Sequence, residues 1–258
     1  MSLDMAEQGV NILWGSFEIK NTRLIHKLLQ QFSRGPLVSL SSLAAGGKRQ
    51  QIAREALNSI ADRFSALPLY FMSFYGTTDV DKIIDAMEYA TYIHDVEHVI
   101  LDNLQFMLTR DHGNGRRGSY YDKFEIQDIA VERFRKFASD KNVHITLVVH
   151  PRKEDEGVPL SMSSVSGTAK ATQEADTVLI LQHENDKKEL QVKKNRFDGT
   201  LGSVPLHFHS SSGRFGEEAE RVEEGRTLTK IKIKDTRDSR LNSDSDIHRD
   251  SLEIDTLI

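Results

Sequence analysis

The sequence contains no cysteine among its 258 residues. This absence excludes a secreted module held together by disulfides and any zinc site built on thiolates. Only 38% of the residues are hydrophobic, and no stretch approaches the roughly 18 consecutive apolar residues that a membrane-spanning helix needs. Residues 1–10 have neither the apolar core of a secretory signal nor the arginine-rich character of a transit peptide. The composition is typical of a globular protein in a reducing compartment.

An excess of positive charge is also missing. The net charge is −5 at pH 7, and residues 217–258 carry twelve acidic and eight basic side chains, so the rest of the chain is close to neutral. A field of this size attracts nucleic acid only weakly. Any affinity for nucleic acid must therefore come from local clusters of Lys and Arg.

Short aliphatic runs alternate with amphipathic segments along most of the chain. Strands are predicted at residues 10–14, 69–74, 99–104, 144–149 and 177–181. Helices long enough to cross over between parallel strands are predicted at residues 22–32, 50–64, 80–92 and 123–140. Because runs that are apolar throughout belong to strands buried on both faces, the pattern predicts an α/β fold with a mostly parallel sheet.

The pattern changes from residue 177 onward. Strand-like runs at 177–181, 189–193 and 204–208 follow one another through short polar turns, which predicts antiparallel strands at one edge of the sheet. We interpret residues 1–216 as one domain. Residues 217–258 are charged and rich in serine, which predicts a disordered, solvated tail.

Polar side chains follow three of the predicted buried strands. Glu18 follows the first strand, Asp102 ends the aliphatic run that begins at residue 99, and His150 follows the next strand. The carboxyl ends of parallel strands share one edge, where open α/β sheets bind ligands. There, Glu18 can polarise a water for attack on a phosphoryl group and Asp102 can hold magnesium. The alternatives are structural: a glutamate that favours a helix dipole, a turn-capping aspartate and a histidine satisfied by its neighbours.

Two later blocks carry cations near strand or loop ends. Residues 167–176 read GTAKATQEAD, and the small side chains suit a loop that enters a short helix near a polyanion. Residues 193–199 read KKNRFDG and follow an edge strand. A basic hairpin end can serve solubility alone, but arginine is also the residue that a neighbouring subunit inserts beside a γ-phosphate.

Taken in order, these blocks resemble a known family. The stretches QGVNILWGSFEI, HVILDNLQFM, HPRKEDE, GTAKATQEAD and KNRFDG resemble the Twinkle-like mitochondrial replicative DNA helicases, and more broadly the hexameric RecA-like helicases of superfamily 4. The resemblance runs from about Leu3 to Phe215. It implies a RecA-like core that binds ATP, or another nucleoside triphosphate, together with Mg²⁺ between the subunits of a ring.

The resemblance also implies roles for single residues. Glu18 resembles the base that activates the attacking water, and Asp102 the Walker B carboxylate that binds Mg²⁺ directly or through water. His150 resembles the sensor of the γ-phosphate. Arg196 resembles an arginine finger and Lys194 its companion, both acting on the nucleotide of the adjacent subunit.

DNA contacts are implied for the segment after His150. Arg152 and Lys153 would open a loop that faces single-stranded DNA in the central channel, and Gly167, Lys170 and Gln173 would close that loop or couple it to the nucleotide. By the same resemblance we expect 5′ to 3′ unwinding at the replication fork, a ring of six or seven copies, mitochondrial replication proteins as partners, and a location in the mitochondrial matrix or nucleoid.

The family's phosphate-binding loop, G-x-x-x-x-G-K-[ST], does not occur in the sequence. Gly47 and Lys48 resemble its end, but Arg49 stands where Ser or Thr binds magnesium, and Ser42 replaces the leading glycine. We therefore expect a C-terminal part of a helicase subunit that is inactive as an ATPase on its own. The alternatives are a non-catalytic single-stranded-DNA-binding or regulatory RecA-like protein, and a RecA-like recombinase or clock-type ATPase.

Overall fold

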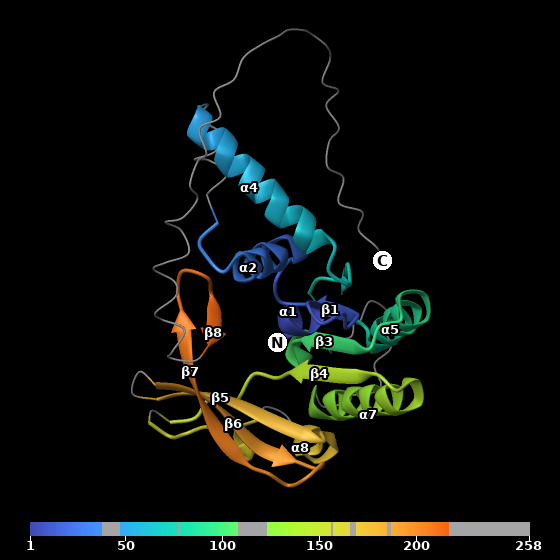
Figure 1. The fold of residues 1–258 in the computed structure, drawn as a ribbon. Helices are drawn as coiled ribbons and strands as arrows, with labels where there is room; N and C mark the ends of the chain where they lie inside the picture. The colour runs from blue at the N-terminus through green and yellow to red at the C-terminus, as the bar shows by residue number, and fades with distance from the viewer. Residues whose placement is uncertain are drawn as a thin grey trace, which may run out of the picture.

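The computed structural model describes residues 1–37, 47–76, 78–107, 123–155, 157–165, 169–184 and 187–216 (Figure 1). These residues form a parallel sheet with the strand order β2-β1-β3-β4 and an antiparallel sheet with the order β5-β6-β7-β8. The predicted α/β class with a mostly parallel sheet and flanking helices is confirmed. The tail predicted at residues 217–258 lies outside the described residues.

The parallel sheet is built around two central strands. Its members are β1 (Ile12–Ser16), β2 (Leu69–Phe71), β3 (His98–Asp102) and β4 (His144–Val148). Ser16 is paired with Asp102, and Asp102 with Val148. This register makes β1, β3 and β4 end together, so the residues that follow them emerge at one edge.

Helices cover both faces of this sheet (Figure 1). One face carries α1 (Ser2–Ala6), α2 (Asn21–Ser33) and α4 (Lys48–Ser65), and the other carries α5 (Val80–His94) and α7 (Lys123–Lys141). Side chains alternate between the two layers, as a strand requires. Ile12 and Ile100 pack with α1, whereas Leu13, Val99 and Leu101 join the core of α5 and α7. This burial on both faces explains why the interior positions of β1 and β3 are apolar.

The four predicted crossover helices are confirmed within two residues at each end. The strands differ more from their predicted bounds. The first lies at 12–16 instead of 10–14, and the run predicted at 69–74 forms a strand only to Phe71. The run predicted at 99–104 stops at Asp102 because Leu104 begins the short helix α6 (Leu104–Met107).

The later strands pair as predicted but occupy a different place. They are β5 (Thr177–Glu184), β6 (Lys187–Asn195), β7 (Gly202–His209) and β8 (Arg214–Gly216). Their antiparallel pairing is confirmed. In the described part of the chain they form a sheet of their own and do not extend the edge of the parallel sheet. The side chains of β5 alternate between exposed and buried, which is typical of a sheet with one covered face.

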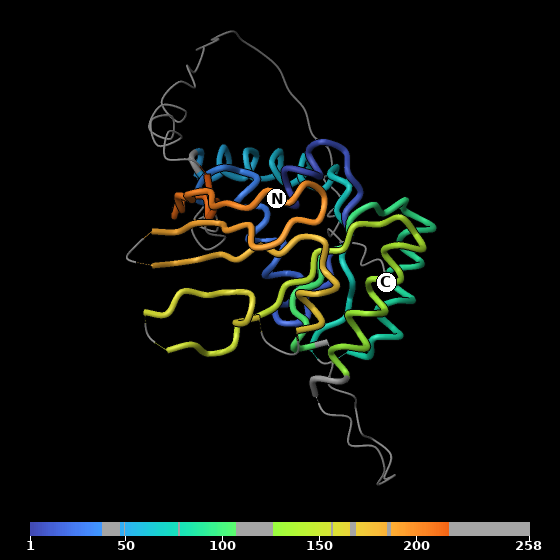
Figure 2. The backbone as a smooth tube through the Cα atoms, turned by 90° about the horizontal axis from the view of Figure 1, so that it is seen from below, coloured from blue at the N-terminus to red at the C-terminus, as the bar shows by residue number. Residues whose placement is uncertain are grey.

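The turn between β7 and β8 joins the two parts of the fold. Gln30 and Gln31 of α2 each donate a side-chain hydrogen bond of 2.9 Å, to the carbonyls of Ser211 and Gly213. The hairpin consequently lies beside α2 in both views (Figures 1 and 2). Among the described residues, no helix combines the length and apolar character needed to cross a bilayer.

Candidate active site

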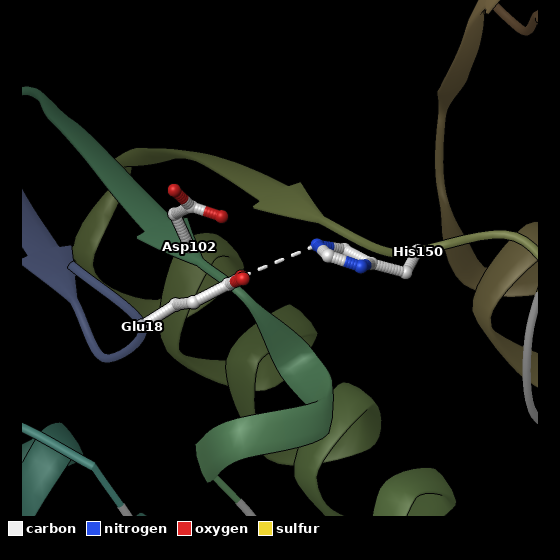
Figure 3. A group of neighbouring side chains, drawn as sticks. All are labelled: Glu18, Asp102 and His150. Atoms are coloured by element: carbon white, nitrogen blue, oxygen red, sulfur yellow. Dashed lines mark ion pairs between the residues drawn. The ribbon is translucent and has the colours of Figure 1, made fainter.

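Three side chains from three strand ends meet at the carboxyl edge of the parallel sheet (Figure 3). Glu18 follows β1, Asp102 ends β3 and His150 follows β4. One ligand atom from each lies within 4.8 Å of the others. The sequence had suggested that these residues share one edge, and the structure brings them into a single cluster.

Glu18 and His150 are close enough to form an ion pair when the imidazole is protonated. Glu18 Oε2 lies 3.3 Å from His150 Nε2, and the side chains are 38% and 54% exposed. Solvent therefore reaches both groups. A ligand at this edge can contact them without displacing the core.

The turn that carries Glu18 is anchored on both sides. The Phe17 N–H donates to the Asp102 carbonyl at 2.7 Å, and Ser16 Oγ donates to the Ile19 carbonyl at 2.8 Å. Phe17 itself is fully buried. Gly15 permits this close packing, since a Cβ there would lie 3.0 Å from Leu101 Cδ2. The glycine in WGSFE thus allows the buried strand to end in an exposed carboxylate.

Asn103 is a site residue that the sequence reasoning missed. Its side chain is fully buried, and its Nδ2 donates to Glu18 Oε2 at 2.6 Å and lies 2.9 Å from His150 Nε2. The peptide bond between Asp102 and Asn103 is cis. A polar residue between the strand-end Asp102 and the apolar Leu104 was the signal that could have identified it.

The environment of Asp102 disfavours its charged form. Burial raises the pKa of this carboxyl, the nearby charge of Glu18 raises the pKa further, and His150 partly opposes the change. Two carboxylates so close together attract a cation. Mg²⁺ prefers oxygen ligands and commonly uses one or two carboxylates. Asp102 and Glu18 therefore fit a magnesium ion, whereas the nitrogen of His150 suits it less well.

Residues 151–165, called here the basic segment for Arg152 and Lys153 at its start, are closed at their base, and three acidic residues (154–156) follow the two cations. Arg152 N–H donates to the Ser164 carbonyl at 2.8 Å, and Pro151 forms a β-bridge with Val165. Arg152 and Lys153 are exposed, and Arg152 Nε lies 3.1 Å from Glu154 Oε1. The segment therefore presents cations near the carboxylate cluster.

The other residues expected to contact DNA or nucleotide are placed differently. The predicted short helix is confirmed as α8 (Lys170–Glu174). Lys170 Nζ lies 2.7 Å from Glu132 Oε2 on α7, so this cation is paired within the chain. Gln173 is exposed. Gly167 lies outside the described residues.

Lys194 and Arg196 bind the carboxyl end of α8. Lys194 Nζ donates to the carbonyls of Thr172 and Gln173 at 2.7 and 2.8 Å. Arg196 donates to the Gln173 carbonyl, and its Nη1 lies 3.2 Å from Asp176 Oδ1. Cations at this end satisfy the last carbonyls and favour the helix dipole. Within one chain the two residues thus cap α8, and their action on a neighbour stays a prediction.

Burial and charge alter the titration of this cap. Burial lowers the pKa of Lys194, and the charge of Arg196 lowers it further. Partial burial raises the pKa of Asp176, but hydrogen bonds from Arg135 and Arg196 outweigh burial and leave the pKa below its usual value. Asp176 therefore stays ionised and holds both guanidinium groups.

Solved structures with a similar fold include an ATPase domain and a replicative helicase. The ATPase domain superposes with a TM-score of 0.66 at 15% identity, covering 82% of this chain and 76% of that chain. The second structure, a DnaB-like replicative helicase studied with its interactions with primase, superposes with a TM-score of 0.65 at 15% identity, covering 82% of this chain and 51% of that chain. This chain spans about half the length of the DnaB-like helicase. At such identity the likeness shows a shared fold.

The sequence also matches a protein-family model. The AAA_25 model, described as an AAA domain, matches residues 2–156, which is more than half of the chain. The matched part includes β1 to β4 and all three members of the carboxylate–histidine cluster. The chain therefore belongs to the AAA_25 family of AAA domains.

Proposed function

We propose that the chain belongs to the ATPase core of a hexameric, RecA-like replicative DNA helicase of superfamily 4, and that it contains the catalytic carboxylates of that core without its phosphate-binding motif. The observation that carries this proposal is the cluster of Glu18, Asp102 and His150, whose ligand atoms lie within 4.8 Å of one another at the carboxyl edge of the parallel sheet. The fold shared with the solved ATPase domain and with the DnaB-like helicase supports it.

Each residue of the cluster has a role in the proposed reaction. Glu18 is exposed enough to take a proton from an attacking water. Asp102 would hold Mg²⁺ directly or through water, and this ion would supply charge neutralisation to phosphate oxygens. His150, the third member of the cluster, directly precedes residues 151–165 and would report the state of the nucleotide to them. Gln173 would help to couple the DNA-binding loop to the nucleotide.

The proposed function also includes assembly into a ring and binding of single-stranded DNA. Arg152, Lys153 and Lys170 would contact single-stranded DNA, and Arg196 with Lys194 would act on the nucleotide of the next copy. By its resemblance to Twinkle-like helicases, the parent protein would unwind 5′ to 3′ at the mitochondrial replication fork with other replication proteins. Imaging of the tagged full-length protein tests the mitochondrial location.

The ATPase activity of the purified chain depends on whether it can bind the phosphates of the nucleotide. The 258 residues contain no G-x-x-x-x-G-K-[ST], the motif whose backbone cradle and lysine neutralise the β- and γ-phosphates. We expect the purified chain to hydrolyse no ATP above background, with or without single-stranded DNA. DNA-stimulated turnover that disappears in Glu18→Gln but persists in Glu97→Gln, an exposed glutamate before β3, would contradict this expectation.

The missing motif also favours a second candidate. A non-catalytic RecA-like protein that binds single-stranded DNA or regulates a partner would keep the sheet and the basic segment without a triphosphate site. A form extended at its N-terminus by a phosphate loop separates the two candidates. The helicase proposal predicts Mg²⁺-dependent hydrolysis that Glu18→Gln abolishes, whereas the second candidate predicts none.

A further inference from the structure

We propose that Asn103 and Gln105 are positioning residues that hold His150 by its ring and by its main chain. Through His150, these two side-chain amides connect Glu18 to residues 151–165. The functional meaning of this connection rests on the proposed function, in which Glu18 faces the nucleotide and the basic segment faces DNA. The connection itself consists of hydrogen bonds that can be tested without either ligand.

The orientation of the Asn103 amide is fixed by a third contact. The Phe106 N–H donates to Asn103 Oδ1 at 3.3 Å, which directs Nδ2 toward the site. Nδ2 has two hydrogens, and two acceptors lie in reach: Glu18 Oε2 at 2.6 Å and His150 Nε2 at 2.9 Å. When the imidazole is neutral, this arrangement has His150 accept from Asn103 at Nε2 and carry its proton on Nδ1. Any ligand that draws Glu18 away removes one of the bonds that orient the amide.

Gln105 holds the main chain of the same histidine. Its Nε2 donates to the His150 carbonyl at 3.1 Å, and the His150 N–H donates to its Oε1 at 3.3 Å. The pair resembles one rung of a β-ladder made by a side chain. Leu104 lies between the two amide residues and is buried in the core with α5 and α7. Both amides therefore project from a rigid support.

The residue after His150 begins the basic segment. Pro151 has a restricted φ angle and bridges Val165, and the Arg152 N–H binds the Ser164 carbonyl at 2.8 Å. A displacement of the His150 main chain therefore moves both ends of the segment together. Arg152 and Lys153 lie at the first of these ends. The path from Glu18 to the cations thus runs through Asn103, His150 and Gln105.

A double-mutant experiment by NMR tests the path in the metal-free, nucleotide-free chain. Glu18→Gln is introduced into the wild type, into Gln105→Leu and into Gln182→Leu. Gln182 is the matched control because it also holds this segment, through the Leu160 carbonyl at 2.9 Å, but does not touch His150. We expect Glu18→Gln to shift the amide signals of Arg152 and Lys153 in the wild type and in Gln182→Leu. In Gln105→Leu the shifts should be lost.

Two results would overturn this part of the proposal: shifts that persist in Gln105→Leu, or no shift in the wild type. Gln105 is partly exposed, so its replacement leaves the core intact. Neither nucleotide nor DNA is used. Failure of the extended form to hydrolyse ATP would therefore count against the proposed function alone, and failure of the shifts against the positioning role alone.

A second measurement tests the role of Asn103, and its readout is the tautomer of His150. The ¹⁵N shifts of its neutral imidazole should show the Nδ1–H form in the wild type and in Gln105→Leu. In Asn103→Ser they should show the Nε2–H form, which a solvated imidazole prefers. Circular dichroism verifies that Asn103→Ser is folded, because Asn103 is fully buried. An Nε2–H form in the wild type would show that Asn103 does not donate to this ring.

Discussion

Arg196 donates a hydrogen bond to Asp176 of its own chain, at 3.2 Å between Nη1 and Oδ1. Arg135 donates to the same oxygen at 3.1 Å, so Asp176 would keep one cation if Arg196 left. This shared carboxylate, just after α8, gives Arg196 a resting position beside the carboxyl end of that helix. To act on the nucleotide of an adjacent subunit, Arg196 must leave Asp176 and contact a phosphate oxygen instead.

The first prediction concerns this exchange. In a form that carries a phosphate loop, Arg196→Ala should lower turnover by about 10³ to 10⁵, the range for arginine fingers, because charge on the transferred phosphoryl group loses its partner. Mixing Arg196→Ala with Glu18→Gln subunits should restore hydrolysis, since some interfaces then pair intact Glu18 with intact Arg196. Turnover of the separate and mixed proteins is the measurement.

Arg135→Ala is the control for Arg196, because it removes the other contact to Asp176 without removing the proposed finger. It should lower turnover far less. If mixed rings form and exchange subunits but recover no hydrolysis, Arg196 acts within its own chain as the cap of α8.

A second prediction concerns the pH dependence of stability. Burial and the charge of His144 lower the pKa of His98 from 6.5 to about 4. The unfolded chain therefore binds this proton near pH 6.5 and the folded chain only near pH 4, so stability is full above pH 6.5 and falls as the pH drops toward 4. We expect the free energy of unfolding in urea to fall by about 2 kcal/mol between pH 7 and pH 5 on account of His98.

His98→Gln should flatten that pH dependence because it removes the titrating imidazole. Glutamine can still bond with Thr146 Oγ1, which lies 2.8 Å from His98 Nε2, so the strand pair is kept. The exposed His183 provides the control variant, His183→Gln, which should leave the slope unchanged. Equal slopes in the wild type and His98→Gln would contradict the assignment.

Asp102 should show a conflict between stability and metal binding. Its pKa is raised, chiefly by burial, so the folded state disfavours its charge and loses stability as the pH rises through that pKa. At pH 7 in EDTA, Asp102→Asn should therefore raise the free energy of unfolding by about 0.5–2 kcal/mol. The same variant should lose Mn²⁺ binding measured by electron paramagnetic resonance.

The exposed Asp140 is the control for Asp102. It pairs with Lys136 at 3.0 Å, and Asp140→Asn should change the free energy of unfolding by less than about 0.5 kcal/mol. Mn²⁺ binding that survives Asp102→Asn would move the metal site elsewhere.

Binding of single-stranded DNA should depend on the cations of the basic segment. Lys153→Ala should weaken binding and reduce the slope of log K against log salt by about 0.7, the value for one phosphate contact with a single strand. Fluorescence anisotropy at several salt concentrations measures both quantities. Arg152→Ala and Lys170→Ala should act in the same direction, and Lys170→Ala less strongly, because Lys170 is paired with Glu132. Lys136→Ala on α7 is the control, and an equal effect there would indicate non-specific attraction.

Gly15→Ala tests the packing beneath Glu18. An added Cβ would lie 3.0 Å from Met72 Sδ and from Leu101 Cδ2 and 3.1 Å from Phe17 Cε2, so the strand must shift. We expect a loss of about 1–3 kcal/mol in the free energy of unfolding in urea. At Gly202 on β7 the same Cβ would meet nothing within 4 Å, so Gly202→Ala should cost much less. Similar losses in the two variants would contradict the packing argument.

Much of the parallel-sheet layer could be predicted because burial on both faces leaves a continuous apolar run. The same logic located Glu18, Asp102 and His150, since a polar residue after such a run must lie at the sheet edge. The separate antiparallel sheet could not be predicted, because alternation along β5 reports one covered face but not which element covers it.

Side-chain contacts between distant segments were beyond the sequence patterns. Nothing in the spacing of Asn103 and Gln105 indicates that both amides bind His150. The contacts of Arg196 with α8 could not be predicted either. A cation that follows an edge strand can face solvent, contact a neighbouring subunit or bind the end of a helix, and the sequence does not distinguish these cases. Their partners depend on how two layers pack in space.

The β7–β8 hairpin, held to α2 by Gln30 and Gln31, is also held to α1 by an ion pair at 2.9 Å between Arg214 Nη2 and Asp4 Oδ1, and this contact has a consequence for the order of folding. It joins residues 210 positions apart, and the entropy of closing so long a loop is lost before the contact is made. The parallel sheet brings together strands that are much closer along the chain, so it should form first. Docking of the β7–β8 turn against α2 and α1 would then be a late step. During synthesis, the contact between α1 and Arg214 could form only after Arg214 has left the ribosome.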